Sequence, residues 1–312
     1  TGKEHPKREI EITWSVEEAE KGDYEHFMLK EIMEQKDSIA RAVNQDGEQI
    51  MHLAKAIKEA RGTFLSGCGT AHKACMAAEY FFSVIADHHV NVSSSGEFKL
   101  YNHFLKPDSL LIVVSQSGET ADVLEAIDAA KKQKSKVISL LNVKGSTMMR
   151  SSDAHFMINA GPEMAVVSTK ATTAQLAVIT LLAYATINKL HEGKLLLMDT
   201  ARTVNDMLNP RYEEHISKLA QILQKYFKEE KKNDVYIIGR SLNYPIALEA
   251  AIKLQETAYV HAEGFAGGEL KHGPLALIEK DTPCIALVAN DETKDEIISN
   301  ANEVKARGGY II

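Results

Sequence analysis

The feature that most constrains how this chain folds is a pattern that occurs twice, with copies 172 residues apart. In each copy a short apolar run ends in glycine, a Gly-Glu-apolar-Lys tetrapeptide follows, and a second apolar run comes later. One such match arises by chance, but three in the same order indicate a duplicated structural unit. The matched pairs are Gly67 with Gly239, residues 96–99 with 268–271, and residues 110–114 with 284–288, the last shifted by two further residues.

Within each copy, short apolar runs alternate with amphipathic helical stretches. This alternation is typical of α/β proteins in which a doubly wound parallel sheet carries helices on both faces. We therefore predict two such units, the second truncated at the C-terminus, because its copy stops at the fourth strand position, residues 310–312. The predicted strands are residues 63–66, 90–92, 110–114, 137–141, 155–158 and 234–239, and the predicted helices lie within 24–60, 71–85, 121–132, 171–190 and 212–227.

The same pattern divides the chain into three parts. Residues 1–25 are polar and weakly patterned, as in a linker. Residues 26–200 hold the N-terminal helices and the first unit, and residues 201–312 hold the second, incomplete unit. A polar stretch at residues 192–199 is predicted to connect the two units without helical structure.

Composition excludes several classes of protein. With 312 residues, 45% of them hydrophobic and 25% charged, the chain can bury a core without disulfides or structural metal. Cys68, Cys75 and Cys284 form no Cys-x-x-Cys pair, which suits a reducing cytoplasm. The net charge of −7 gives no basic surface for nucleic acid, and no apolar run approaches the roughly 20 residues that cross a bilayer. We expect a cytoplasmic protein that acts on a small molecule.

The strongest local motif is Ser-Gln-Ser-Gly-Glu-Thr at residues 115–120, hereafter the serine loop, between a predicted strand and a predicted helix. Its hydroxyls and the free N–H groups of a helix N-terminus suit a phosphate or another anion, at the sheet edge where such folds bind ligands. The alternative is that Ser and Thr only cap the helix. The matching residues 289–293 lack serine and carry acids, so we expect a phosphate only in the first unit.

A second candidate lies in the other copy. Glu249, Lys253 and Glu256 share one face of the helix that Pro245 is predicted to open. Spacing alone favours a solvated row of ion pairs. The functional alternative is a carboxylate base beside an ammonium group. Residues 261–274, interpreted as a glycine-rich loop dense in titratable groups, favour the functional alternative.

Two weaker motifs remain. Residues 67–70, Gly-Cys-Gly-Thr, lack the third glycine of a dinucleotide site, so NAD is not expected. We expect no other cofactor and no metal. Cys68 has no basic partner nearby in the sequence and is interpreted as a small buried residue. Ser168 and Thr169 precede a predicted helix and are expected either to cap it or to offer hydroxyls to a sugar.

Together these segments resemble the isomerase half of the glutamine:fructose-6-phosphate aminotransferase family, which is built of two sugar-isomerase (SIS) domains. The resemblance covers nearly the whole chain, beginning with His-Phe-Met-Leu-Lys-Glu-Ile at residues 26–32. The serine loop alone identifies only the SIS superfamily. Residues 168–170, Ser-Thr-Lys, and the block 249–274 are more specific.

The resemblance implies roles for individual residues. Glu256 corresponds to the base that moves a proton between C1 and C2 of the sugar, with Lys253 as its partner and Glu249 in support. His272 corresponds to the ring-opening histidine, which is supplied to the neighbouring subunit. Ala71 stands where the family commonly has serine, and Gly118 supports the serine loop. The implied sugar-phosphate ligands are Thr70, Ser115, Gln116, Ser117, Thr120, Val166 and Ser168.

The implied reaction converts fructose 6-phosphate and ammonia from glutamine into glucosamine 6-phosphate, in a homodimer whose chains also carry a glutaminase domain. The family's glutaminase cysteine and its Schiff-base lysine have no match in these 312 residues, so we expect this chain to bind sugar phosphate without turning it over. One alternative is a non-catalytic regulatory SIS module, which has no use for Glu256 or His272. Another is a related SIS isomerase or deglycase, which would share both residues.

Overall fold

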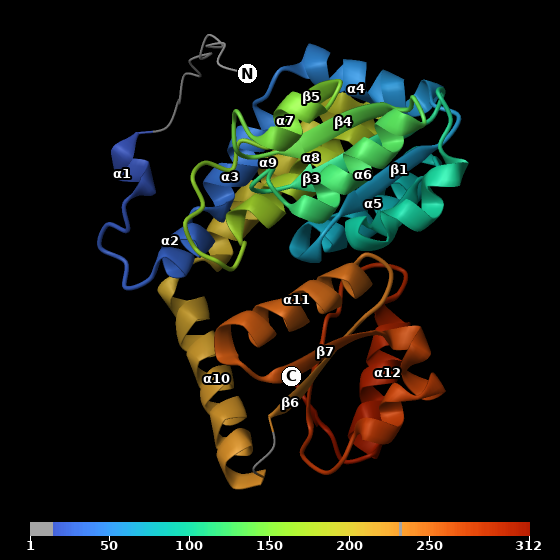
Figure 1. Ribbon diagram of the computed structural model, residues 1–312. Helices are drawn as coiled ribbons and strands as arrows, with labels where there is room; N and C mark the ends of the chain where they lie inside the picture. The colour runs from blue at the N-terminus through green and yellow to red at the C-terminus, as the bar shows by residue number, and fades with distance from the viewer. Residues whose placement is uncertain (1–14, 231–232) are drawn as a thin grey trace.

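The computed structural model describes residues 15–230 and 233–312. Two α/β units lie one above the other, and the long helix α10 descends along the lower one (Figure 1). Residues 1–14 of the predicted linker lie outside the described residues. The rest of the linker contains the short helix α1 (Val16–Ala19), which Ser15 and Glu18 cap reciprocally.

The first unit contains a five-stranded parallel sheet in the order β2-β1-β3-β4-β5. The chain runs outward from β1 to β2, then returns to place β3 on the other side of β1, so the strand order reverses between β1 and β3. The strands are β1 (Thr63–Gly67), β2 (Asn91–Ser94), β3 (Leu110–Ser115), β4 (Lys136–Leu141) and β5 (Ala154–Met157). The helical elements that follow them are α5 (Gly69–Ala86), the 3-10 segment η1 (Ser95–Phe104), α6 (Ala121–Lys132), α7 (Thr147–Ser151), α8 (Lys170–Thr186) and α9 (Leu190–Met207).

Helices cover both faces of this sheet, as the fully buried strand β3 shows. Leu110, Ile112 and Val114 pack into the layer formed by α5, α8, α9 and two N-terminal helices. Leu111 and Val113 point the other way, into the layer of η1, α6 and α7. Because successive side chains of a strand point to opposite faces, a strand buried on both sides is apolar throughout. The predicted doubly wound sheet is confirmed.

The second unit repeats this topology. Its four parallel strands have the order β7-β6-β8-β9, which matches β2-β1-β3-β4 of the first unit. Helices α10 and α11 pack on one face, and α12 packs on the other. The elements are α10 (Pro210–Glu230), β6 (Asp234–Gly239), α11 (Asn243–Ala258), β7 (His261–Ala266), the 3-10 segments η2 (Gly267–His272) and η3 (Pro274–Leu277), β8 (Pro283–Ala286), α12 (Lys294–Ala306) and β9 (Tyr310–Ile311).

The duplication extends to unusual backbone conformations. Gly69 has φ +53° and Ser241, 172 residues later, has φ +51°. Asp87 and Tyr259 have the same offset and end α5 and α11 at φ +46° and +55°. Left-handed conformations are costly for residues with a side chain, so their recurrence at matched positions confirms that the two units share one architecture.

The helical stretch predicted over residues 24–60 forms three helices: α2 (Phe27–Met33), α3 (Gln35–Val43) and α4 (Gly47–Glu59). The helical spacing of the apolar residues was predicted correctly, but local capping divides the stretch into separate helices. Asp46 accepts a hydrogen bond from the Glu48 N–H at 2.9 Å and so begins α4.

The non-helical link predicted at residues 192–199 is wrong, because these residues lie inside α9. Leu197 and Ala201, one turn apart, are buried in the core that α9 shares with α3 and α8. The apolar stripe of this helix is narrow and interrupted by charged residues, so the sequence pattern did not indicate a helix here. The predicted domain boundary between residues 200 and 201 therefore falls within α9.

The segment 261–274 is not a loop throughout, because its first half is strand β7. A Cβ atom at Gly264 would lie 2.7 Å from the backbone of Ala247 in α11. This glycine therefore allows the helix to pack closely on the strand. Helix α11 begins at Asn243, two residues before Pro245.

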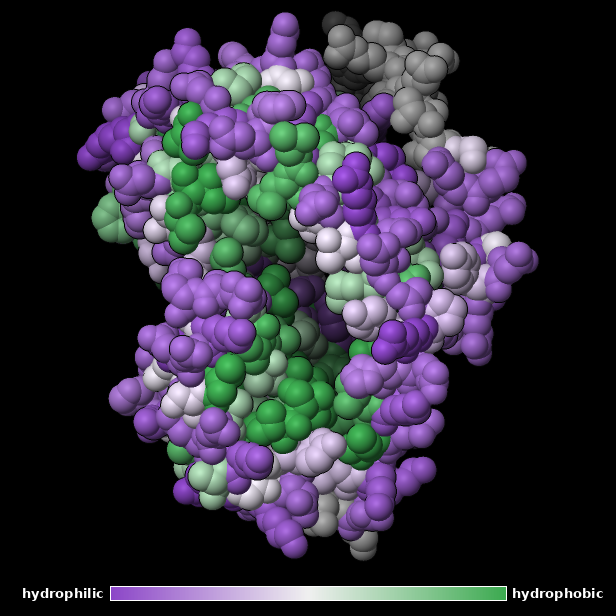
Figure 2. Space-filling view, turned by 180° about the vertical axis from the view of Figure 1, so that it is seen from behind, coloured by the Kyte–Doolittle hydropathy of each residue, from purple (hydrophilic) through white to green (hydrophobic). Residues whose placement is uncertain are grey.

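The two units contact each other mainly through α5 and α11. From behind, the molecular surface is hollowed between them (Figure 2). None of the described helices is long and apolar enough to cross a membrane.

Candidate functional site

The turn after β1 and the serine loop after β3 lie side by side at the carboxyl edge of the first sheet, because β1 and β3 are paired neighbours. Thr70 belongs to the first turn of α5, and Thr120 immediately precedes α6. Open parallel sheets bind ligands where the strand order reverses. The structure therefore brings two of the sequence-predicted segments together at the favoured position of the fold.

The hydroxyl oxygens of the serine loop accept hydrogen bonds within the loop. Ser115 Oγ accepts from the Gly118 N–H at 3.0 Å, and Ser117 Oγ accepts from the Glu119 N–H at 3.3 Å. Neither hydroxyl hydrogen has an acceptor among the described residues, so both can donate to an anion. Thr120 makes no capping hydrogen bond with its side chain. These hydrogen bonds lie within the loop and do not cap α6, which begins at Ala121.

The backbone of the serine loop is fixed against α7. Gly118 has φ +68°, and a Cβ atom there would lie 2.6 Å from Ser146 Cβ. Its carbonyl accepts from the Met148 N–H at 3.0 Å. Glu119 Oε1 accepts from the Thr147 N–H at 2.7 Å, which lowers the pKa of Glu119. Glycine is therefore required at position 118, and the loop is held in shape before any ligand arrives.

A polar cluster joins the two units beside this loop. Thr70 Oγ1 donates to Glu249 Oε1 at 2.9 Å and accepts from Lys253 Nζ at 3.1 Å. Lys253 Nζ also lies 3.1 Å from Glu249 Oε1 and 3.1 Å from Glu256 Oε2. The predicted shared face of α11 is present, and Thr70 connects it to the first unit.

Glu249 is the buried member of this cluster, with 8% of its surface exposed. Burial raises the pKa of its carboxyl, while Lys253 and Thr70 act in the opposite direction. Glu249 Oε2 is buried and has no hydrogen-bond partner among the described residues. The solvated row of ion pairs that spacing favoured is therefore wrong for Glu249. Lys253 links this buried carboxylate to Glu256, whose side chain is 40% exposed and reaches solvent.

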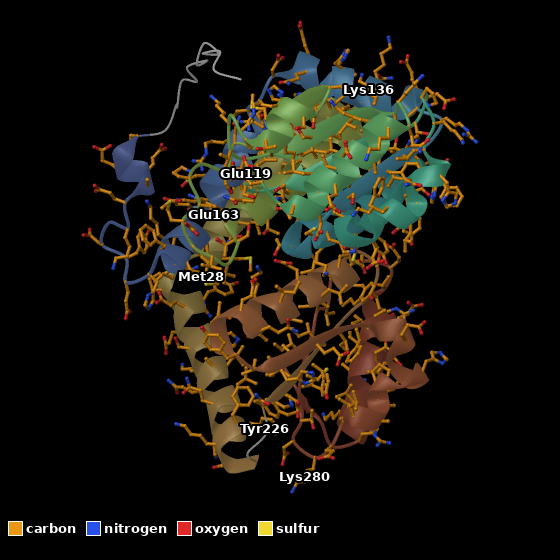
Figure 3. All side chains as sticks on the ribbon, viewed as in Figure 1. Met28, Glu119, Lys136, Glu163, Tyr226 and Lys280 are labelled. Carbon is orange, nitrogen blue, oxygen red and sulfur yellow. The ribbon has the colours of Figure 1, made fainter. Side chains whose placement is uncertain are left out.

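The expectation that Ser168 or Thr169 caps α8 is wrong, because Glu163 takes this role. Glu163 Oε1 accepts from the backbone N–H groups of Thr169 at 2.9 Å and Ala171 at 3.0 Å. A carboxylate is favoured there by the unpaired N–H groups and the helix dipole. Figure 3 shows Glu163 on the loop that precedes α8.

Glu163 also fixes the direction in which the Ser168 hydroxyl donates its hydrogen. Ser168 Oγ donates to Glu163 Oε2 at 2.9 Å, and Thr172 Oγ1 lies 3.2 Å away. With its only hydrogen committed, Ser168 can offer a ligand an acceptor but no donor. It therefore suits a sugar hydroxyl better than a phosphate, in contrast to Ser115 and Ser117.

Asn142, directly after β4, connects the serine loop to the loop that precedes α8. Its N–H donates to the Gln116 carbonyl at 3.3 Å, and its Nδ2 donates to the Gly161 carbonyl at 2.8 Å. Sequence reasoning missed both Asn142 and Glu163. The available signals were an amide side chain directly after a buried strand and an acid shortly before a helix N-terminus.

The other predicted residues differ in how exposed they are. The Val166 side chain is 97% exposed, and His272 is exposed at the end of η2. Ala71 is buried. Burial raises the pKa of the Cys68 thiol, which agrees with an unreactive side chain. The homodimer and the role of His272 in a neighbouring site stay predictions.

A comparison with protein families agrees with this geometry. A model described as "SIS domain" matches residues 56–185 and 230–312, the two sheet-bearing parts of the chain. The chain belongs to the SIS domain family.

Known relatives of this SIS chain share a narrower description. The glutamine–fructose-6-phosphate aminotransferase (isomerizing) of Pyrococcus horikoshii is 40% identical over 317 residues, covering 100% of this chain and 52% of the relative. That of Brucella melitensis is 40% identical over 308 residues, covering 94% of the chain and 49% of the relative. The chain spans about half the length of the curated relatives it matches.

Solved structures point the same way. The C-terminal domain of glucosamine-fructose-6-phosphate aminotransferase from Francisella tularensis has a TM-score of 0.78 and 34% identity, covering 94% of this chain and 84% of that one. Tagatose-6-phosphate ketose/aldose isomerase from Escherichia coli has a TM-score of 0.71 and 16% identity, covering 90% and 79%, which shows a shared SIS fold alone. The resemblance inferred from the sequence is confirmed.

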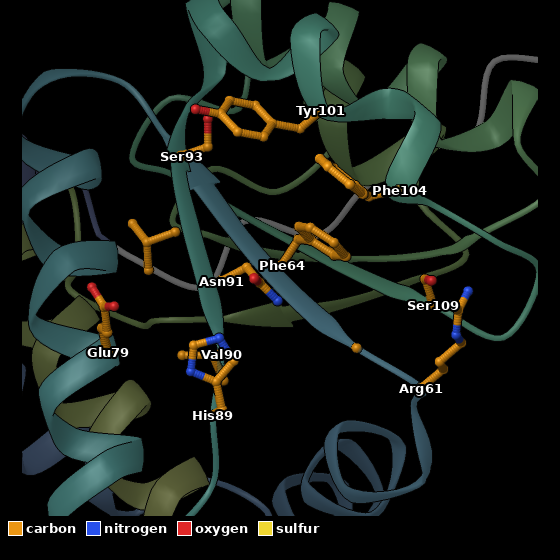
Figure 4. A pocket seen from close by; sticks show the side chains of 12 residues that line it. Arg61, Phe64, Glu79, His89, Val90, Asn91, Ser93, Tyr101, Phe104 and Ser109 are labelled. Carbon is orange, nitrogen blue, oxygen red and sulfur yellow. The ribbon is translucent and has the colours of Figure 1, made fainter.

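A cavity of about 510 Å³ in the first SIS unit lies away from the candidate site. Phe64, Tyr101 and Phe104 line it (Figure 4). Arg61 and Ser109 also border it, and they precede β1 and β3. None of the candidate site residues named above lines this cavity. The cavity is therefore not part of the site described above.

Proposed function

We propose that this chain is the sugar-phosphate isomerising part of a glutamine–fructose-6-phosphate aminotransferase, and that it binds fructose 6-phosphate between its two SIS units. The observation that carries the proposal is the pairing of two kinds of group across one contact. The first unit offers the free hydroxyl donors of Ser115 and Ser117, and the second offers Lys253 and Glu256. Thr70 connects the two sets.

The phosphate is assigned to the serine loop. A phosphate dianion needs donors, and the loop supplies the hydroxyls of Ser115, Ser117 and Thr120 together with the N-terminal N–H groups of α6. Ser168 and Thr70 have already committed their hydroxyl hydrogens to Glu163 and Glu249. These two residues would accept hydrogen bonds from sugar hydroxyls, which places the sugar between the loop and α11.

The proton transfer is assigned to Glu256. Isomerisation removes a proton from the carbon next to a carbonyl and returns it to the neighbouring carbon, so it needs one carboxylate that reaches the substrate. Glu256 reaches solvent, whereas Glu249 is buried and bonded to Thr70. Lys253, between them, would steady Glu256 and neutralise negative charge that develops on the sugar oxygen.

We also propose that the chain works within a longer protein, because it spans about half the length of its curated relatives. There it would receive ammonia from a glutaminase domain and form glucosamine 6-phosphate, as a homodimer in the cytoplasm. The three free cysteines agree with a reducing compartment.

Calorimetric titration with glucose 6-phosphate tests the phosphate assignment. Ser117→Ala should weaken binding by about 1.5–3 kcal/mol, the range for hydrogen bonds to charged groups. Thr200→Ala is the control, because Thr200 is an exposed residue of α9 whose hydroxyl donates to the Leu196 carbonyl of the same helix. Equal affinity of the Ser117→Ala variant and the control would remove the serine loop from the site.

A non-catalytic regulatory SIS module is the second candidate, because the serine loop alone suffices to bind a phosphosugar. It predicts the same titration result but assigns no chemistry to Glu256. Exchange of the sugar C1 or C2 proton with solvent separates the two proposals.

A further inference from the structure

The loop between β5 and α8, residues 158–169, carries two of the proposed sugar-binding residues, Val166 and Ser168. It contains no helix or strand, so its own backbone hydrogen bonds do not define its shape. Such a segment holds a binding geometry only where other groups satisfy and fix its backbone. The groups that hold this loop come largely from the N-terminal helices.

Both ends of the loop are fixed by charged side chains of these helices. At its start, Arg41 of α3 donates through Nε to the Asn159 carbonyl at 3.0 Å and through Nη2 to the Ala160 carbonyl at 2.6 Å. At its end, the Lys170 side chain is 2% exposed, and its Nζ lies 2.5 Å from Glu34 Oε2. These contacts span more than 100 residues of sequence.

Glu31 of α2 holds the middle of the loop. Its Oε1 accepts from the Met164 N–H at 2.5 Å and from the Ala165 N–H at 3.1 Å. These two amides immediately precede Val166. Figure 3 shows this region, where the loop carrying Glu163 lies close to the helix that carries Met28.

Burying the Glu31 carboxyl costs desolvation free energy, so its hydrogen bonds to the loop need to offset that cost. Only 1% of its surface is exposed, and burial raises the pKa of its carboxyl, while the two N–H donors oppose that shift. Its Oε2 has no hydrogen-bond partner among the described residues. An apolar side chain would fill the same space without this desolvation, but it would remove the acceptor that the Met164 and Ala165 N–H groups share.

We propose that Glu31 is a positioning residue, which fixes the β5–α8 loop so that Val166 and Ser168 meet the sugar of the bound ligand. The N-terminal helices are then part of the ligand site, although they contribute no group that touches the ligand. The proposal deepens the proposed function and rests on it for the identity of the ligand. It rests on geometry alone for the control of the loop.

The test compares two ligands in Glu31→Ala. Inorganic phosphate needs only the serine loop, whereas glucose 6-phosphate also needs the β5–α8 loop. Glu31→Ala should weaken glucose 6-phosphate binding about tenfold, the loss expected when hydrogen bonds to one charged acceptor are removed, and leave phosphate binding unchanged. Glu59→Ala, which removes an exposed glutamate of α4 paired with Lys55, is the control and should change neither.

A second measurement is independent of any ligand. In the free protein, Glu31→Ala should speed amide hydrogen exchange of Met164 and Ala165 about tenfold, while amides of the β3 core keep their protection. Glu31→Gln retains an acceptor oxygen and should restore both slow exchange and binding. If Glu31→Ala does not fold, Glu31→Asp, which keeps the charge but withdraws it by one methylene, should show the same selective losses.

The outcomes separate the two proposals. If wild-type protein binds neither ligand, the proposed function fails, and the exchange rates alone still decide whether Glu31 holds the loop. Unchanged exchange at Met164 and Ala165 in a folded Glu31→Ala variant would overturn the positioning role. Equal weakening of both ligands would also overturn it, because that result indicates general damage to the unit.

Discussion

The two SIS units of this chain share strand order and turn conformations, yet they differ at the edge where each could bind a ligand. In the first unit the loop after β3 is rich in hydroxyls whose hydrogens have no acceptor among the described residues. In the second, the matching loop satisfies itself. Asp291 Oδ1 accepts from both the N–H and the hydroxyl of Thr293, at 2.9 and 2.7 Å. An acid that occupies the helix N-terminus repels a phosphate.

The turn after the first strand differs in the same way. Thr70 in the first unit bonds groups of the other unit. Arg240 in the second unit bonds within its own unit, to Glu296 at 2.8 Å and to Asn300 at 3.2 Å. The two units therefore share one backbone, while under the proposed function the first would bind the phosphate and the second would contribute the α11 side chains. Function follows the site residues and not the fold.

The strongest test of this difference between the two units is to remove the proposed base, Glu256, from the second unit. Glu256→Gln should lower exchange of the sugar C1 or C2 proton by about 10²-fold or more and leave glucose 6-phosphate affinity unchanged. The measurement is deuterium uptake from solvent, in a protein extended to the length of the curated relatives. Glu59→Gln, which alters another lysine-paired glutamate, is the control. Wild-type exchange in Glu256→Gln would return α11 to a purely structural role.

A smaller effect distinguishes the two loops directly. Thr120 and Thr293 occupy matched positions before α6 and α12. Thr120→Ala should weaken glucose 6-phosphate binding by about 1.5–3 kcal/mol, because a donor to a charged group is lost. Thr293→Ala should leave binding unchanged, since its hydroxyl bonds Asp291. Calorimetric titration of both variants decides the point, and equal losses would show that the second unit also binds phosphate.

The smallest expected effect is the pH dependence of stability at the contact between units. Burial raises the pKa of Glu249 above its ordinary value of 4.5. A raised folded-state pKa means that the carboxyl's contribution is complete below about pH 4.5 and is lost as pH rises through the folded-state value. The free energy of unfolding of wild type minus that of Glu249→Gln should therefore decline from acidic toward neutral pH. Urea unfolding at several pH values measures this difference, and a constant or rising difference would contradict it.

Much of the architecture could be predicted from sequence because it follows local rules. The apolar run at residues 110–114 predicted a buried strand, and the 172-residue offset predicted the matching turns. The failures were local signals that longer-range packing overrode. The polar residues of α9 hid its buried Leu197 and Ala201, and Gly264 suggested a loop where it provides a close contact between α11 and β7.

By itself the sequence determined the duplicated α/β architecture, the hydroxyl-rich loop of the first unit and the shared face of the α11 charges. These features depend on residues that are a few positions apart, as in the spacing of apolar residues, the choice of turn residues and the spacing of charges on a helix. They can therefore be predicted from the sequence. Only the tertiary structure decided that Thr70 bonds Glu249 across 179 residues, that Glu163 directs the hydroxyl of Ser168, and that Glu31 holds the β5–α8 loop. Burial and packing between distant segments decide which donors and acceptors meet, and no local pattern encodes that choice.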